Sequence, residues 1–92
     1  MTRSLPRPFT SLTEYFTAAR DFIACLEAEG HRVAAAELDE GYRCLNGLTD
    51  GWALFLESID KVRAERGAEL SDDERRRLEA LRRVARGAVR RR

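Results

Sequence analysis

Two cysteines and one histidine are the side chains best suited to chemistry, and they occupy positions 25, 44 and 31. Structural zinc sites use four Cys or His ligands in close pairs, and these three residues do not have that spacing. We therefore expect no metal site and no cofactor. His31 follows Gly30 at a turn between helices, where we interpret it as a solvent-facing residue at a helix start. A catalytic role would need a partner in a pocket, and four short helices offer no obvious cleft.

The two cysteines are expected to be free thiols. Antiparallel helices joined near Gly30 would place Cys25 opposite a residue close to position 36. Cys44 would then lie about 12 Å further along its helix, beyond the reach of a disulfide. We expect both to be reduced, half-buried side chains in a cytoplasmic protein.

Other catalytic patterns are absent from the sequence. Gly47 and Gly51 flank Leu48, Thr49 and Asp50, without the lysine and hydroxyl residue of a phosphate-binding loop. The Glu-x-x-His pairs of di-iron bundles do not occur either. We therefore expect a protein that is not an enzyme and has no catalytic residues.

Arginines near the C-terminal end carry the one functional signal. At helical spacing they form a band opposite an apolar face, which comprises Arg75, Arg76, Arg82, Arg83, Arg86 and Arg90. Like charges at i,i+4 repel one another by a few tenths of a kcal/mol per pair, and Glu79 can neutralise only part of the band. Three interpretations stay open. The band is a solvated face, it docks on acidic residues such as Glu37, Asp39 and Glu40 in the same chain or a partner, or it contacts phosphates.

The charge is distributed unevenly along the chain. The formal net charge is +1, yet residues 1–70 carry eight basic and twelve acidic side chains, whereas residues 71–92 carry nine arginines and four acids. A negative body and a positive end permit docking of one on the other, or attraction of an external polyanion.

Helix signals position these residues. Residues 1–10 contain both prolines and no periodicity, so we expect an irregular arm followed by one helical domain at 11–90. Capping boxes at Ser11 and Ser71, with a left-handed stop at Gly30, predict helix ends. We also expect a stop at Asn46-Gly47 and a cap at Thr49 or Asp50. The predicted helices span about 12–29, 31–46, 50–66 and 72–90.

Apolar residues recur every three to four positions in each predicted helix. The four stripes are Leu12, Tyr15, Phe16, Ala19, Phe22, Ile23 and Leu26; Ala34, Ala35, Leu38, Tyr42 and Leu45; Trp52, Phe55, Leu56, Ile59 and Val62; and Leu78, Leu81, Val84, Ala85, Ala88 and Val89. Short links leave successive helices little choice but to run antiparallel. The sequence predicts an all-α fold, a small antiparallel (up-down-up-down) four-helix bundle or helical-hairpin pair.

Two residues break the stripe pattern. Gly41 lies inside the second stripe, which indicates either a close helix contact, a bulky neighbour such as Trp52, or neutral drift. Leu54 points away from its stripe and is either an ordinary exposed leucine or part of an oligomer surface.

Partner expectations follow from size. Thirteen of about forty apolar residues are alanine, so the core is thin and self-association would add stability. We expect a homo-oligomer, a dimer above all, or a helical protein partner, and no membrane span or signal peptide. The leading hypothesis is an interaction or regulatory module acting through helical faces. The alternative is a nucleic-acid-associated protein whose C-terminal helix contacts phosphates. Sequence-specific reading by a helix-turn-helix at 31–66 is disfavoured, because Asp50 would repel phosphate.

Overall fold

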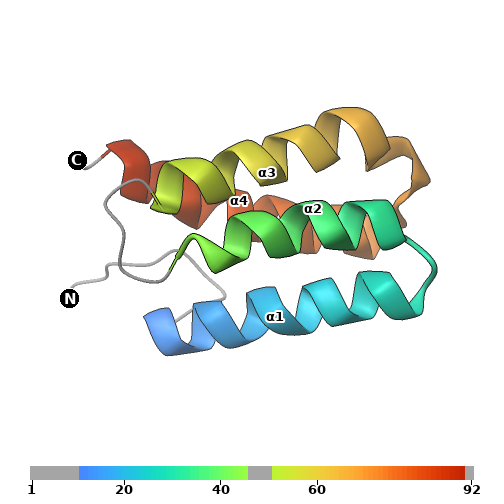
Figure 1. The fold of residues 1–92 in the computed structure, drawn as a ribbon, viewed down its shortest axis with the longest axis horizontal. Helices are drawn as coiled ribbons and strands as arrows, with labels where there is room; N and C mark the ends of the chain where they lie inside the picture. Colours follow the sequence, from blue (N-terminus) through green and yellow to red (C-terminus); the bar gives the residue numbers. More distant parts are fainter. Residues whose placement is uncertain (1–10, 46–50, 91–92) are drawn as a thin grey trace.

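The computed structural model describes residues 11–45 and 51–90, and this part of the chain is an all-α antiparallel bundle (Figure 1). Its helices are α1 (Leu12–Ala28), α2 (Arg32–Arg43), α3 (Gly51–Arg66) and α4 (Asp72–Arg90). A short 3-10 turn, η1 (Gly67–Glu69), joins α3 to α4. The predicted up-down-up-down four-helix bundle is confirmed.

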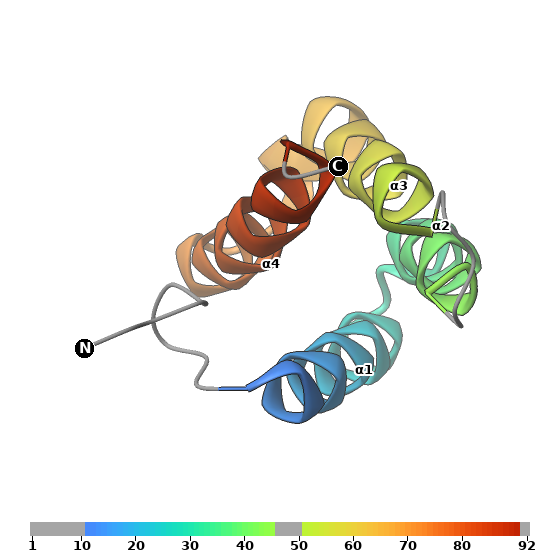
Figure 2. The same ribbon diagram turned by 90° about the vertical axis from the view of Figure 1, so that its left-hand side faces the viewer.

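The helices follow one another around the bundle axis in chain order (Figure 2). Packing is closest between α2 and α3, then between α3 and α4, and it is weakest between α4 and α1. The backbone of α3 therefore lies close to neighbours on both sides, whereas the backbone of α1 lies close only to that of α2.

The helix signals predicted at Ser11, Gly30 and Ser71 agree with the local geometry. The Ser11 hydroxyl accepts a hydrogen bond from the Glu14 backbone N–H at 3.1 Å, and Gly30 has a φ of 92° after α1. At α4, the Glu74 N–H donates to Ser71 Oγ while the Ser71 N–H donates to Glu74 Oε1 at 2.8 Å, which completes a capping box. α2 ends at Arg43, earlier than predicted. The stop expected at Asn46-Gly47, the cap expected at Thr49 or Asp50 and the arm at 1–10 lie outside the described residues.

The core combines the inner residues of all four stripes. Its fully buried side chains include Tyr15, Phe22, Leu26, Leu38, Phe55, Ile59, Val62 and Leu78. Leu12 was predicted to join the first stripe, and this is wrong. It is the first residue of α1 and is 49% exposed, so it does not join the buried core.

Gly41 marks the closest approach of two helices. A Cβ at this position would overlap Ser58 Oγ and lie 2.7 Å from Ser58 Cβ and 3.2 Å from the Phe55 Cα. Gly41 therefore allows a close contact between α2 and α3, which is one of the expected explanations. A larger residue at this position would not let the two helices pack at this separation.

An aromatic cluster joins α1 to α3 across the core. The Tyr15 ring lies 5.6 Å from Trp52 and 6.4 Å from Phe55, and Phe16 stacks on Trp52 at 6.2 Å. The Tyr15 hydroxyl donates to the Leu81 carbonyl at 2.8 Å and so ties α1 to α4. Over the described ranges, no helix combines the length and apolar character needed to cross a bilayer.

Candidate functional site

The arginine band of α4 divides into two groups with different environments. Arg75 turns back on its own helix start, where it pairs with Asp72 and donates to the Gly67 and Leu70 carbonyls at 3.0 Å. These bonds hold η1 against the first turn of α4. Arg75 therefore has a structural role.

Arg82 is the second arginine that is engaged within the fold. Its Nε donates to Asp60 Oδ1 of α3 at 2.6 Å, and its Nη1 lies 3.8 Å from Glu79. The hydrogen bond to Asp60 raises the pKa of Arg82 above its usual value, with partial burial acting in the opposite direction. Glu79 also pairs with Arg63 of α3, so these side chains link α3 to α4.

The other four arginines form what we call the outer arginine strip, defined as Arg76, Arg83, Arg86 and Arg90. All four are exposed, and none has an ion-pair partner among residues 11–45 and 51–90. At 100° per residue they fall within an arc of about 80°, directly opposite the buried face of α4. From Arg76 to Arg90 the strip runs for about 21 Å at the helical rise.

Two of the three acids expected to receive the band pair with other side chains. Glu37 pairs with Lys61 at 3.5 Å, and Asp39 pairs with Arg43 at 2.9 Å. Among the described residues, the acids that pair with arginines of the band are Asp60, Asp72 and Glu79, and no ion pair joins the band to Glu37, Asp39 or Glu40. The outer arginine strip is left facing solvent.

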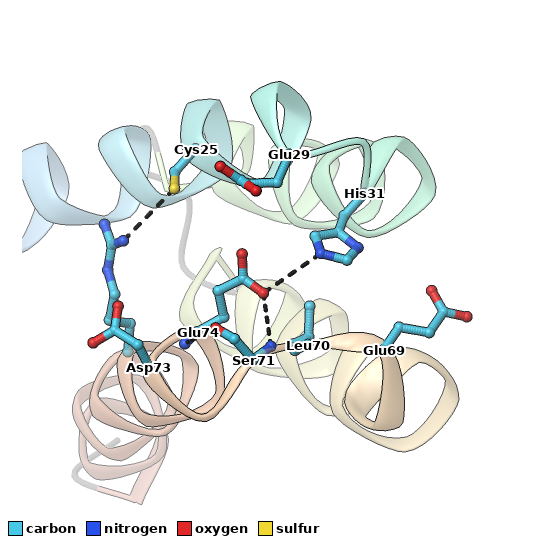
Figure 3. A pocket seen from close by; sticks show the side chains of 9 residues that line it. Cys25, Glu29, His31, Glu69, Leu70, Ser71, Asp73 and Glu74 are labelled. Carbon is cyan, nitrogen blue, oxygen red and sulfur yellow. Dashed lines mark hydrogen bonds and ion pairs between the residues drawn. The ribbon is translucent and has the colours of Figure 1, made fainter.

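An open pocket lies where the turn between α1 and α2 meets the start of α4 (Figure 3). Its volume is about 500 Å³. The lining residues are Cys25, Glu29, His31, Glu69, Leu70, Ser71, Asp73, Glu74 and Arg77. Four carboxylates against one arginine give it an acidic lining.

His31 lies in this pocket, which corrects two expectations. The side chain is only 20% exposed, and its Nε2 is 3.4 Å from Oε1 of Glu74 (Figure 3). It is therefore not solvent-facing, and the bundle does have a cleft. The pair joins the start of α2 to the capping box of α4, because the same Glu74 oxygen accepts the Ser71 N–H.

Cys25 and Arg77 form the other wall of the pocket. Arg77 Nη1 lies 3.8 Å from the Cys25 sulfur, and its guanidinium sits over the Phe22 ring with its carbon 5.0 Å from the ring centre. Such a cation–π contact contributes about 0.5–2 kcal/mol. The thiol of Cys25 and the imidazole of His31 thus contact different partners. No hydrogen bond joins these two described residues, so they do not form a nucleophile–base pair. Both cysteines are half-buried and free, as expected.

Glu74 and Arg77 are pocket residues that the sequence interpretation missed. From sequence, Glu74 is only the partner of Ser71 in a capping box, and its contact with His31 depends on how α4 packs against the turn after α1. Arg77 lies at a different angle around the axis of α4 from the arginine band. It is about 100° from Arg76 and next to the apolar face. That offset was visible in the helical spacing.

Leu54, the candidate oligomer surface, is 40% exposed on α3. Two other large apolar side chains are exposed in the described residues, Leu12 and Val33, and they lie on α1 and α2. The exposed apolar residues are thus divided among three helices. Leu54 has no exposed apolar neighbour of this size on its own helix.

Comparisons with known proteins and metal-site geometry add no candidate. No family model, curated protein or solved structure matches the chain. In the portion that the structure describes, no group of three or more His, Cys, Asp or Glu side chains is placed to hold a metal ion. The outer arginine strip and the open pocket are therefore the two features from which a function can be argued.

Proposed function

We propose that the protein is a non-enzymatic interaction or regulatory module, and that it binds an anionic partner through the outer arginine strip of α4. The observation that carries this proposal is the division of the arginines. Arg75 and Arg82 bind acids or carbonyls inside the fold, whereas the strip residues extend into solvent on a single arc. Four unneutralised cations on one face repel one another, and a bound anion removes that repulsion.

The surface chemistry supports a charged partner. Protein–protein interfaces usually place aromatic or aliphatic anchors at their centre, and the strip contains guanidinium groups instead. A cytoplasmic location forms part of the proposal, supported by two free thiols in a small chain.

The test compares two variants with equal loss of charge. Arg83→Gln with Arg86→Gln neutralises half of the strip, and Arg20→Gln with Arg32→Gln removes two exposed cations from α1 and α2. Binding of labelled poly-glutamate and of a labelled DNA duplex is measured by fluorescence anisotropy at 50 mM salt. We expect the strip variant to bind at least one probe several-fold more weakly and the control to match wild type. No binding of either probe by the wild-type protein would refute the proposal.

A homodimer is the second candidate, favoured by the opposite charges of residues 1–70 and 71–92. In this arrangement the strip of one copy docks on acidic surface of the other. Size-exclusion chromatography with light scattering at micromolar concentration should then report a dimer that the Arg83→Gln, Arg86→Gln variant dissociates. Loss of the dimer in Leu54→Ser would place Leu54 in the interface as well. A monomeric wild-type protein would exclude this candidate.

A further inference from the structure

The partner class can be narrowed from the composition of the strip. The arc that holds Arg76, Arg83, Arg86 and Arg90 also contains two acids of α4, Asp72 and Glu79. Asp72 already pairs with Arg75, and Glu79 already pairs with Arg63 and Arg82. None of the large exposed apolar side chains described above lies on α4. A protein partner would bring scattered carboxylates to this face without an apolar anchor. A dense array of phosphates would satisfy all four guanidinium groups.

The spacing of the strip suits a duplex. Arg83, Arg86 and Arg90 lie within about 11 Å, and Arg76 extends the strip to about 21 Å. Double-stranded nucleic acid carries about one negative charge per 1.7 Å of its axis, so a phosphate lies within reach of each arginine. The outer arginine strip therefore needs a partner with a high density of negative charge, and it does not need acids at matching positions.

The start of α4 makes base reading unfavourable. Recognition helices contact bases with their N-terminal residues, and α4 begins with Asp72, Asp73 and Glu74. These acids repel phosphates and confine contact to the later turns. α4 also contains no Asn or Gln, the side chains that pair with adenine. Its opposite face is buried against the bundle through residues such as Leu81 and Ala85.

We infer that the outer arginine strip binds the phosphate backbone of a nucleic-acid duplex, without reading its base sequence. This inference rests on the proposed function and names the partner of the same surface. Contacts to three or four phosphates predict that the logarithm of affinity falls with the logarithm of salt with a slope of about −3. Between 50 and 200 mM salt the affinity should therefore fall about 60-fold.

The experiment uses the full chain and two 20-base-pair DNA duplexes with equal composition and different sequence. Anisotropy titrations are run at several salt concentrations, with poly-glutamate as the protein-like anion. We expect the two duplexes to bind with affinities within about twofold of each other. In Arg83→Gln with Arg86→Gln, two phosphate contacts are lost, so the slope of log affinity against log salt should become shallower by about 2. The affinity at 50 mM salt should fall about tenfold. Arg20→Gln with Arg32→Gln is the matched control, and circular dichroism verifies that both variants stay helical.

The outcomes separate this inference from the proposed function. Strip-dependent binding of poly-glutamate without duplex binding overturns the inference and leaves the proposed function standing. Absence of binding to either probe overturns both. Equal duplex binding by the strip and control variants shows that the strip is not the site. A preference above about tenfold for one duplex refutes binding through phosphates alone.

Discussion

At the scale of single residues, direction on the helix decides the environment of each arginine. Arg76 and Arg77 are neighbours in sequence, yet Arg76 is exposed and Arg77 lies against Phe22 and the Cys25 sulfur. Arg82 and Arg83 differ in the same way, because Arg82 faces Asp60 of α3. A charge count along α4 therefore overstates the number of arginines available to a partner.

Tyr15 gives a prediction at this scale. Burial raises the pKa of Tyr15 far above its usual value of 10, so the folded protein keeps the phenol protonated in strong base. The unfolded chain releases that proton near pH 10, so the unfolded state binds fewer protons there and the free energy of unfolding falls as the pH rises further. This group alone should contribute a loss of about 1.4 kcal/mol per pH unit above 10.

Urea unfolding of the wild-type protein and Tyr15→Phe between about pH 8 and 11 measures the effect. At pH 8 the variant should be less stable by about 1 kcal/mol, because the hydrogen bond to the Leu81 carbonyl is lost. That deficit should shrink as the pH rises through 10. Tyr42→Phe, which leaves the Tyr15 hydroxyl in place, is the control, and parallel curves for wild type and Tyr15→Phe would contradict the prediction.

At the scale of helices, the sequence predicts those helix ends that depend on residues close together in the chain. Capping at Ser71 depends on residues three positions apart, and the stop at Gly30 depends on one backbone angle, so sequence alone predicts both. The end of α2 at Arg43 and the exposure of Leu12 were not predicted, because apolar periodicity alone fixes neither a helix end nor the burial of a terminal residue. Gly41 was ambiguous for the same reason, because its explanation lies in Ser58 on another helix.

Gly41→Ala tests the helix contact directly. Alanine favours helix by about 1 kcal/mol over glycine, but the added methyl group would overlap Ser58 and crowd the Phe55 backbone, which forces α2 and α3 apart. Overpacking of this kind costs about 1–3 kcal/mol, so we expect a lower midpoint of thermal unfolding. Gly67→Ala is the matched control, since a Cβ there meets nothing within 4 Å. Ser58→Gly should partly rescue Gly41→Ala, and additivity of the two substitutions would argue against a direct clash.

At the scale of the whole molecule, the candidate site could be predicted only in part. The arginine band could be predicted from sequence because it lies on one helix. Its division into paired and exposed residues could not, because the pairing of Arg82 depends on the position of Asp60 on α3. The pocket was not predicted because its walls come from the end of α1, the start of α2 and the start of α4. Residues 43 positions apart, such as His31 and Glu74, share no sequence signal of their contact.

The uneven packing of the bundle predicts uneven local stability. α3 packs closely on both α2 and α4, and it contributes the fully buried Phe55, Ile59 and Val62. The backbone of α1 lies close to one neighbour, α2. Among the described residues, its side-chain links to α4 include the Tyr15 hydroxyl bond and the Arg77 contacts with Phe22 and Cys25.

Segments with fewer packed neighbours open at lower free energy, so amides of α1 should exchange with solvent before those of α3 under native conditions. Hydrogen exchange followed by NMR measures this residue by residue. Arg77→Ala removes the contacts with Phe22 and the Cys25 sulfur, and it should speed exchange in α1 several-fold while leaving the Phe55 to Val62 amides nearly unchanged. Arg76→Ala, a neighbouring exposed arginine, is the control. Exchange of the α1 and α3 amides in a single step would contradict the prediction. It would show that α1 opens together with the rest of the bundle and not as a separate unit.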